Sequence, residues 1–232
     1  MRSTRSYPRI SPVPAPPDKP AGSARVAEPR GAAAGLKLPR SFYARPVLQV
    51  ARDCIGKILV HRTAEGETAG RIVEAEAYRG PLDRAAHSSR GRTARTAAMF
   101  GPPGHAYVYF LYGVCWAFNI VVAGEGEPHA VLIRALEPVR GDSLMAARRR
   151  KAARDRELAN GPGKLTQAMA ITGADYGRDL CGDSLYLETA AIPAGRISRS
   201  PRINVAYAGR WAERPWRFYE RGNRYVSVAP RD

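Results

Sequence analysis

The chain has 232 residues, enough for one large hydrophobic core or two small ones, and a formal net charge of +16. This excess of Lys and Arg favours a polyanionic partner, most often nucleic acid and sometimes an anionic membrane. Cys54, Cys115 and Cys181 lie far apart and form no CxxC pair, so neither a zinc site nor a disulfide framework is predicted. A chain of this kind is expected in the reducing cytoplasm.

Residues 1–37 are rich in Pro, Ala, Arg and Ser and show no apolar period. Such a segment cannot bury enough surface to offset the entropy of ordering it, so we predict a flexible basic arm. The arm holds seven Lys or Arg and two Asp or Glu, hence +5, which leaves +11 of the +16 on residues 38–232. We predict that residues 38–232 form a single domain, basic in its own right.

Two short helices and a hairpin are predicted at the start of this domain. Ser41 can cap the first helix, which Pro46 keeps short, and the second helix covers residues 47–55. Alternating apolar side chains predict strands over residues 57–62 and 69–78. The short glycine-containing turn between them makes these two strands a hairpin.

The strand at 69–78 has two very different faces. Successive side chains point to opposite sides of a strand, so Glu74, Glu76 and Tyr78 share one face. The other face carries small apolar side chains, namely Val73, Ala75 and Ala77. Two interpretations remain open: a half-solvated strand with merely wet carboxylates, or a carboxylate at the mouth of a pocket beside an aromatic wall.

A basic loop and a second hairpin follow. The loop at 79–95 contains five Arg, which are either solvated or face phosphates. Strands are predicted over 106–110 and 116–122. Tyr112 stands at the tip between them, either folded back onto the surface or projecting as a wedge between base steps.

The stretch from Thr96 to Gly124 contains no charged residue and is long enough to cross a bilayer. It also contains Pro, Gly, His and Asn, so we predict a turn and two buried strands, and no membrane span. The next strand, at 128–136, buries Arg134 within an apolar run. Arg134 therefore needs a partner, and Glu76 is a candidate.

Helices are predicted over 141–158, which carries a run of basic residues, and over 165–171. The segment before the second helix superficially resembles a phosphate loop, but its glycine spacing is wrong and Lys164 precedes Leu165, so nucleotide hydrolysis is excluded. Backbone amides at this helix start could still hold one DNA phosphate. Short strands are predicted for the rest of the chain, over 184–188, 203–206 and 225–228, with Arg217–Tyr219 between two turns.

Six ordered blocks stand out against this background: Arg71–Tyr78, Asp83–Ser88, Met99–Phe100, Tyr107–Gly113 with Asn119, Val131–Pro138 and Asn160–Leu165. In this order they resemble the alkyladenine (3-methyladenine) DNA glycosylase family, over roughly Leu38 to Val228. Residues 1–37 show no such match.

The resemblance implies a mixed α/β (α+β) fold, a single domain around a curved antiparallel β-sheet flanked by helices, with no metal and no organic cofactor. It implies a monofunctional DNA glycosylase of base excision repair, which flips damaged purines out of double-stranded DNA and hydrolyses the N-glycosidic bond. Expected substrates are 3-methyladenine, 7-methylguanine, hypoxanthine and ethenoadenine. We expect a monomer, not bound to a membrane, in the cytoplasm or at a prokaryotic nucleoid.

The resemblance also implies catalytic roles. Glu76 matches the general base that activates the attacking water, and Arg134 falls where the family has an arginine near that water. A carboxylate there can take the proton and stabilise the positive charge that develops on the sugar, and Arg134 would keep it ionised. Tyr112 matches the wedge that fills the gap left in the duplex.

The pocket for the flipped base is implied in the same way. Tyr78, His87 and Tyr109 match walls that sandwich the base, and aromatic faces attract the cationic alkylated purines. Asn119 matches a floor residue that disfavours the 2-amino group of guanine. Val205 matches an apolar contact to the base.

Two departures from the family pattern bear on substrate preference: Asn204 stands where Gly is expected, and Glu127–His129 lengthens a turn.

Two other functions stay open. The basic surface alone would serve a non-catalytic nucleic-acid-binding module, and Glu74 with Glu76 could form the carboxylate pair of a sugar hydrolase. We interpret Glu74 as structural. The remaining histidines (His61, His105, His129) are expected at the surface or in turns, and the tryptophans (Trp116, Trp211, Trp216) in packing roles.

Overall fold

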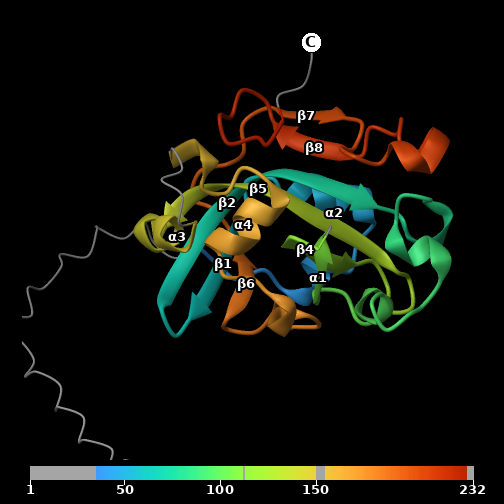
Figure 1. Cartoon of the computed structure of the whole chain (residues 1–232), viewed down its shortest axis with the longest axis horizontal. Coiled ribbons are helices and arrows are strands. Elements are labelled where there is room, and N and C mark those ends of the chain that lie inside the picture. The colour runs from blue at the N-terminus through green and yellow to red at the C-terminus, as the bar shows by residue number, and fades with distance from the viewer. Residues whose placement is uncertain (1–34, 112, 150–154, 229–232) are drawn as a thin grey trace, which may run out of the picture. The chain divides into compact units, whose positions relative to one another are not determined.

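The computed structural model describes residues 35–111, 113–149 and 155–228 (Figure 1). In these residues the strands are β1 Ile58–Thr63, β2 Gly66–Tyr78, β3 Ala106–Leu111, β4 Cys115–Val122, β5 His129–Arg140, β6 Leu185–Glu188, β7 Ile197–Ser200 and β8 Arg217–Glu220. The α-helices are α1 Arg40–Tyr43, α2 Val47–Cys54, α3 Asp142–Arg149 and α4 Pro162–Ala168. Short 3₁₀ turns connect them.

The eight strands form one antiparallel sheet, in which six follow the order β3-β4-β5-β2-β1-β6. The 13-residue strand β2 organises the sheet. One of its edges pairs with β5, while its other edge pairs with β1 over its first half and with β8 over residues 74–76. Strand β7 then pairs with β8 beyond β2 (Figure 1). The predicted mixed α/β fold around an antiparallel sheet is confirmed.

Three irregularities interrupt the pairing of β2 with β5: one between Ala69 and Gly70, and two close together around Glu74. Ile72 pairs with Leu136, Glu74 with Ala135, and Ala75 with Ile133. Around Glu74, one residue on each strand therefore has no counterpart: Val73 on β2 and Arg134 on β5. Bulges of this kind bend a strand and turn side chains to a different face.

The bulges correct one prediction about the faces of β2. Ala75 and Ala77 lie in the main hydrophobic core, as expected, but Val73 does not. Val73 instead packs with Ala135 and Tyr225 in a separate small cluster. On β5, Ile133 and Leu136 both lie in the main core, so the strict alternation of side chains along β5 is interrupted at Arg134.

In the main core the sheet packs against helix α2, whose buried face is Val47, Val50, Ala51 and Cys54, and against residues of α3 and α4. Proline preceding the helix and an apolar side chain at every third or fourth position explain why this segment is helical. The predicted helix at 47–55 is confirmed. Ser41 was expected to cap the first helix but lies within α1, which begins after Pro39 without a side-chain cap.

The last third of the chain contains the largest differences from prediction. Residues 203–206 and 225–228 are bends and turns, while the strands there are β7 and β8. Asn204 has a φ of 58°, which no extended strand permits. The helix predicted over residues 165–171 is α4. It starts at Pro162, three residues earlier than predicted, because proline suits a first helical turn.

The predicted helix at 141–158 is described only in part. Helix α3 covers Asp142–Arg149, and Asp155–Glu157 is a 3₁₀ turn. Residues 150–154 lie outside the described part, as do almost all of residues 1–37. The uncharged stretch at 96–124 forms a 3₁₀ turn, β3 and β4. Within the described ranges, no helix combines the length and hydropathy needed to cross a membrane.

Candidate active site

Glu74 and Glu76 are both completely buried. The half-solvated interpretation of β2 is therefore wrong, since each carboxylate is removed from water and requires partners inside the protein. Strand β8 pairs with the edge of β2, and the backbone amides of Ile203 and Ser227 reach the two carboxylates from segments on either side of β8.

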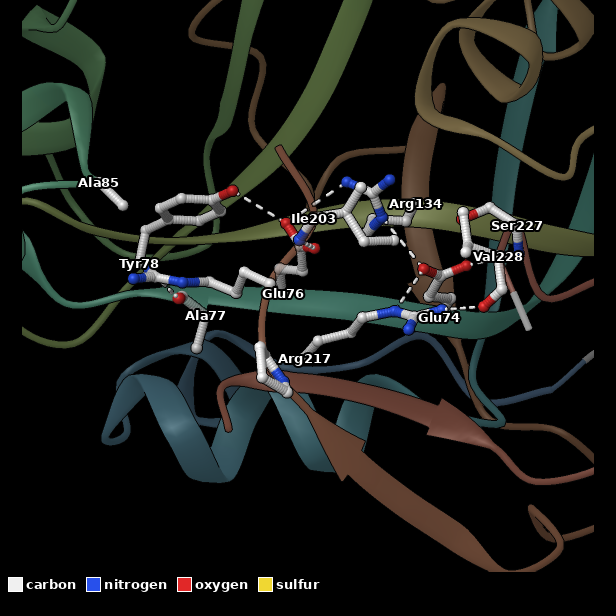
Figure 2. Close-up of polar contacts among 12 residues, drawn as sticks. Glu74, Glu76, Ala77, Tyr78, Ala85, Arg134, Ile203, Arg217, Ser227 and Val228 are labelled. Carbon is white, nitrogen blue, oxygen red and sulfur yellow. Dashed lines mark hydrogen bonds and ion pairs between the residues drawn. The ribbon is translucent and has the colours of Figure 1, made fainter. Parts of the chain in front are cut away.

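Glu76 has three polar neighbours (Figure 2). Its Oε2 accepts a hydrogen bond of 2.8 Å from the Tyr78 hydroxyl and lies 3.4 Å from Nη1 of Arg134. Its Oε1 accepts one of 2.8 Å from the backbone amide of Ile203. Because a carboxylate offers about four acceptor sites, one remains for a further donor such as water.

Glu74 is held in a different environment on the same strand. Its Oε1 accepts hydrogen bonds from Nε of Arg134 at 3.0 Å and Nε of Arg217 at 2.8 Å (Figure 2). Its Oε2 accepts one from the amide of Ser227 at 2.7 Å. Arg217 had no assigned role in the sequence, because a single arginine in a four-residue strand gives no periodic signal.

Arg134 joins the two carboxylates and is only 7 % exposed. Burial opposes the charge on its guanidinium, but Glu76 and Glu74 outweigh burial and raise the pKa of Arg134 above its ordinary value. The predicted partnership of Arg134 with Glu76 is confirmed. Arg134 is a residue of β5 without a counterpart on β2, and its side chain contacts both Glu74 and Glu76.

A cavity of about 330 Å³ opens beside this cluster. Alternate positions of three neighbouring strands line it: Tyr107, Tyr109, Ala117, Asn119, Ala130, Leu132 and Arg134. The intervening positions Val108, Phe118, Ile120, Val131 and Ile133 belong to the main core. Tyr78 at the end of β2 and segments flanking the sheet complete the lining, the latter with Ala85, His87, Asn204 and Val205, among others. Its volume is at the lower end of the usual range for small-molecule pockets.

Aromatic rings form one side of the cavity. The rings of His87 and Tyr109 lie edge to face, 4.5 Å apart, and Nδ1 of His87 lies 2.8 Å from the Tyr107 hydroxyl. Asn119 donates from Nδ2 to the Tyr107 carbonyl at 3.0 Å. Arg95, from the basic loop, places its guanidinium 4.9 Å from the centre of the Tyr109 ring.

Burial, together with Arg95 and Arg90, lowers the pKa of His87 from 6.5 to about 4, so the ring is neutral at neutral pH. Between these values the unfolded chain binds a proton at His87 that the folded chain does not, so stability falls as the pH falls. We expect His87→Gln to lose less stability than the parent between pH 7 and pH 5. Urea unfolding at both pH values measures this, and an equal loss in the two proteins would contradict it.

The structure brings together seven of the eight residues to which the sequence assigned a role. Six of them line the cavity: Tyr78, His87, Tyr109, Asn119, Arg134 and Val205. Glu76 contacts two of these residues, Tyr78 and Arg134. Tyr112 lies outside the described residues.

The backbone conformation of Asn204 explains how Asn can stand where the family pattern has Gly. Its φ of 58° is left-handed, a conformation open to Gly and tolerated by Asn. The residue can therefore replace Gly without changing the local chain path, although it adds a side chain to the cavity lining.

The histidine prediction was wrong for His61. This side chain is 5 % exposed, with Nδ1 2.7 Å from the Met169 carbonyl and Nε2 3.7 Å from Asp175. The expected packing role of tryptophan is confirmed at Trp216, which is buried against Trp211. Across the described ranges, no three His, Cys, Asp or Glu side chains are grouped closely enough to hold a metal ion.

A buried carboxylate and arginine beside an aromatic cavity, on a strongly basic chain, are consistent with an enzyme that acts on a base in nucleic acid. The model of the methylpurine-DNA glycosylase (MPG) family matches residues 41–224. The chain belongs to this family, as the sequence blocks indicated, and is a hydrolase of the N-glycosyl bond.

Individual relatives agree with the family match. A protein of Methanocella arvoryzae named "Putative 3-methyladenine DNA glycosylase" is 52% identical over 197 residues, which cover 84% of this chain and 98% of the relative. Proteins with the same name from Anaeromyxobacter dehalogenans and Clostridium acetobutylicum are 50% identical over 196 residues and 44% identical over 205 residues. The matches cover 84% and 85% of this chain, and 87% and 100% of the two relatives.

Proposed function

We propose that this chain is a monofunctional DNA glycosylase of base excision repair that excises alkylated and deaminated purines with a water molecule activated by Glu76. Its substrates would include 3-methyladenine, 7-methylguanine, hypoxanthine and ethenoadenine. One observation carries the proposal: the partners of Glu76 (Tyr78, Arg134 and Ile203) all line the cavity, whereas Glu76 itself is shielded from bulk solvent.

Binding begins with extrusion of the damaged nucleotide, because a base within the stack cannot reach a buried carboxylate. Unstacking costs a few kcal/mol, and less for a damaged or mispaired base, which already favours lesions. Tyr112 would fill the gap in the duplex. The flipped purine would lie among Tyr78, His87 and Tyr109, whose rings suit a flat and often cationic base.

Hydrolysis then depends on the charge near the sugar. A purine alkylated at N3 or N7 is cationic and leaves readily, and the anomeric carbon becomes positively charged as the bond stretches. Glu76 would stabilise this charge and accept a proton from the water on its remaining acceptor site. Arg134 would orient that water and, with Tyr78 and the Ile203 amide, hold the carboxylate in place.

Selection against normal bases would lie deeper in the cavity. Asn119, fixed by its bond to the Tyr107 carbonyl, would disfavour the 2-amino group of guanine, and Val205 would contact the base on its apolar side. Asn204 would modify the rim of this pocket.

The sugar-hydrolase alternative loses its main support in the structure. Of the three partners of Glu74, only Arg134 lines the cavity, and Arg217 and Ser227 do not. Glu74 therefore serves to hold Arg134 and β8 together, which agrees with its structural interpretation.

Release of free bases from a panel of duplexes tests the proposal. Each duplex carries one 3-methyladenine, 7-methylguanine, hypoxanthine, ethenoadenine or undamaged guanine, and chromatography identifies the released base. We expect release of damaged purines, little release of guanine, and strand cleavage only after added alkali. Binding of all duplexes without release of any base would support the non-catalytic module instead.

A further inference from the structure

Behind the cavity lies an ion pair with no assigned role, formed by Arg202 and Asp83. Both side chains are 0 % exposed. The guanidinium donates to both carboxylate oxygens, from Nη1 at 2.5 Å and from Nη2 at 2.9 Å. Its remaining bonds go to backbone carbonyls, from Nη1 to Ala77 at 2.9 Å and from Nη2 to Trp211 at 3.0 Å.

The same guanidinium lies close to two aromatic rings. Its central carbon is 4.7 Å from the centre of the Tyr78 ring and 5.1 Å from that of Trp216. Tyr78 lines the cavity and Arg202 does not. The group that contacts the Tyr78 ring is thus itself bonded to the backbone of β2, at the Ala77 carbonyl.

The pair also connects the chain segments that carry the rest of the site. Asp83 accepts hydrogen bonds from the amides of Arg79 and Ala85, in the segment that leads to His87. Arg202 belongs to the segment between β7 and β8. The next residue in this segment is Ile203, whose amide donates to Glu76. Ala85 and Val205, one from each segment, pack together with Tyr78 in one hydrophobic cluster.

We propose that Arg202, held by Asp83, is a positioning residue for base excision: it sets the plane of the Tyr78 ring and the position of the Ile203 amide on Glu76. The inference rests on the proposed function of these two residues. A buried ion pair contributes little net stability, because desolvation offsets the attraction between the charges. A guanidinium can nevertheless bond to a carboxylate and two carbonyls while lying flat on a ring, which an ammonium group cannot do.

Arg202→Lys tests this, because it keeps the charge opposite Asp83 and removes the planar fork. Arg71→Lys is the matched control: like Arg202, Arg71 bonds to both oxygens of a carboxylate, that of Glu220, and it lies on β2 outside the cavity. The measurement is single-turnover release of hypoxanthine from an inosine duplex over a range of enzyme concentrations, well below each melting temperature.

For Arg202→Lys we expect the maximal excision rate constant to fall about 10- to 100-fold, a loss of the size that small misplacements of catalytic groups produce. The half-saturating enzyme concentration should change less than about threefold, and Arg71→Lys should keep both values within about threefold of the parent. A folded Arg202→Lys protein with the parental rate constant overturns the inference, and so does an equal fall in Arg71→Lys. If Arg202→Lys does not fold, the double variant Asp83→Asn/Arg202→Met is measured instead. It leaves no unpaired buried charge, and the same criteria apply to it.

Glu76→Gln separates this inference from the function on which it rests. Loss of excision in Glu76→Gln with a parental rate in Arg202→Lys defeats only the role of Arg202. Undiminished excision in Glu76→Gln defeats the proposed function, whatever Arg202→Lys does.

Discussion

Glu76→Gln should bind lesion-containing duplexes with parental affinity and lose excision by roughly 10²–10⁴-fold, the contribution expected of a general base. Glutamine has nearly the same volume, and its amide oxygen can still accept the hydrogen bond from the Ile203 amide. It cannot take a proton from water or stabilise positive charge on the sugar. Single-turnover base release and duplex binding, measured on the same preparations, give the two quantities.

Glu74→Gln is the matched control for this experiment, because it makes the same chemical change on the same strand two residues away. Glu74 accepts hydrogen bonds from two arginines and one amide, so its replacement should lower the melting temperature more than Glu76→Gln does. In the folded state it should excise bases at a rate close to that of the parent. Equal losses of excision in the two variants would remove the special role of Glu76.

Arg134→Met should lower the free energy of unfolding by about 3–5 kcal/mol, the usual effect of removing one partner from a buried ion pair. Arg134 is the cation within 4 Å of Glu76 among the described residues, whereas Glu74 keeps Arg217. The substitution therefore leaves a fully buried carboxylate with only neutral donors. Urea unfolding at neutral pH measures the difference.

The double variant Glu76→Gln/Arg134→Met provides the control for this second prediction. It removes the stranded charge, so it should be more stable than Arg134→Met alone, and the two effects should not add. A loss below about 1 kcal/mol in Arg134→Met, or a double variant less stable than the single one, would show that Arg134 does not compensate the charge of Glu76.

The sequence was informative where side-chain periodicity and local turn signals determine structure. Alternation predicted β1, β3 and β4 closely, and two residues of β3 that are two positions apart, Tyr107 and Tyr109, both line the cavity. The need of a buried arginine for a counter-charge correctly indicated that Arg134 contacts Glu76. Both rules concern one strand or one pair of charges, so a single sequence is sufficient for them.

What was missed depends on contacts between segments distant in the sequence. Strands β7 and β8 are four residues long and contain arginines, so they show little apolar alternation. The pairing of Arg202 with Asp83 joins residues 119 positions apart, and no local pattern predicts it. Glu74 and Glu76 are buried against Ile203, Arg217 and Ser227, which lie far away in the sequence. Because Arg217–Tyr219 was predicted to lie between two turns and not in a strand, nothing in the sequence indicated this burial.

The bulges at Val73 and Arg134 have a consequence for engineering this enzyme. The two extra residues compensate each other, one on each strand. The pairing of Arg71 with Glu137 before the bulges and that of Glu76 with Leu132 after them are therefore in the same register. Deleting the extra residue from only one strand would leave the other uncompensated and rotate the following side chains through the sheet. Any chimaera or redesigned scaffold that borrows this chemistry should therefore transplant β2 and β5 together as one unit.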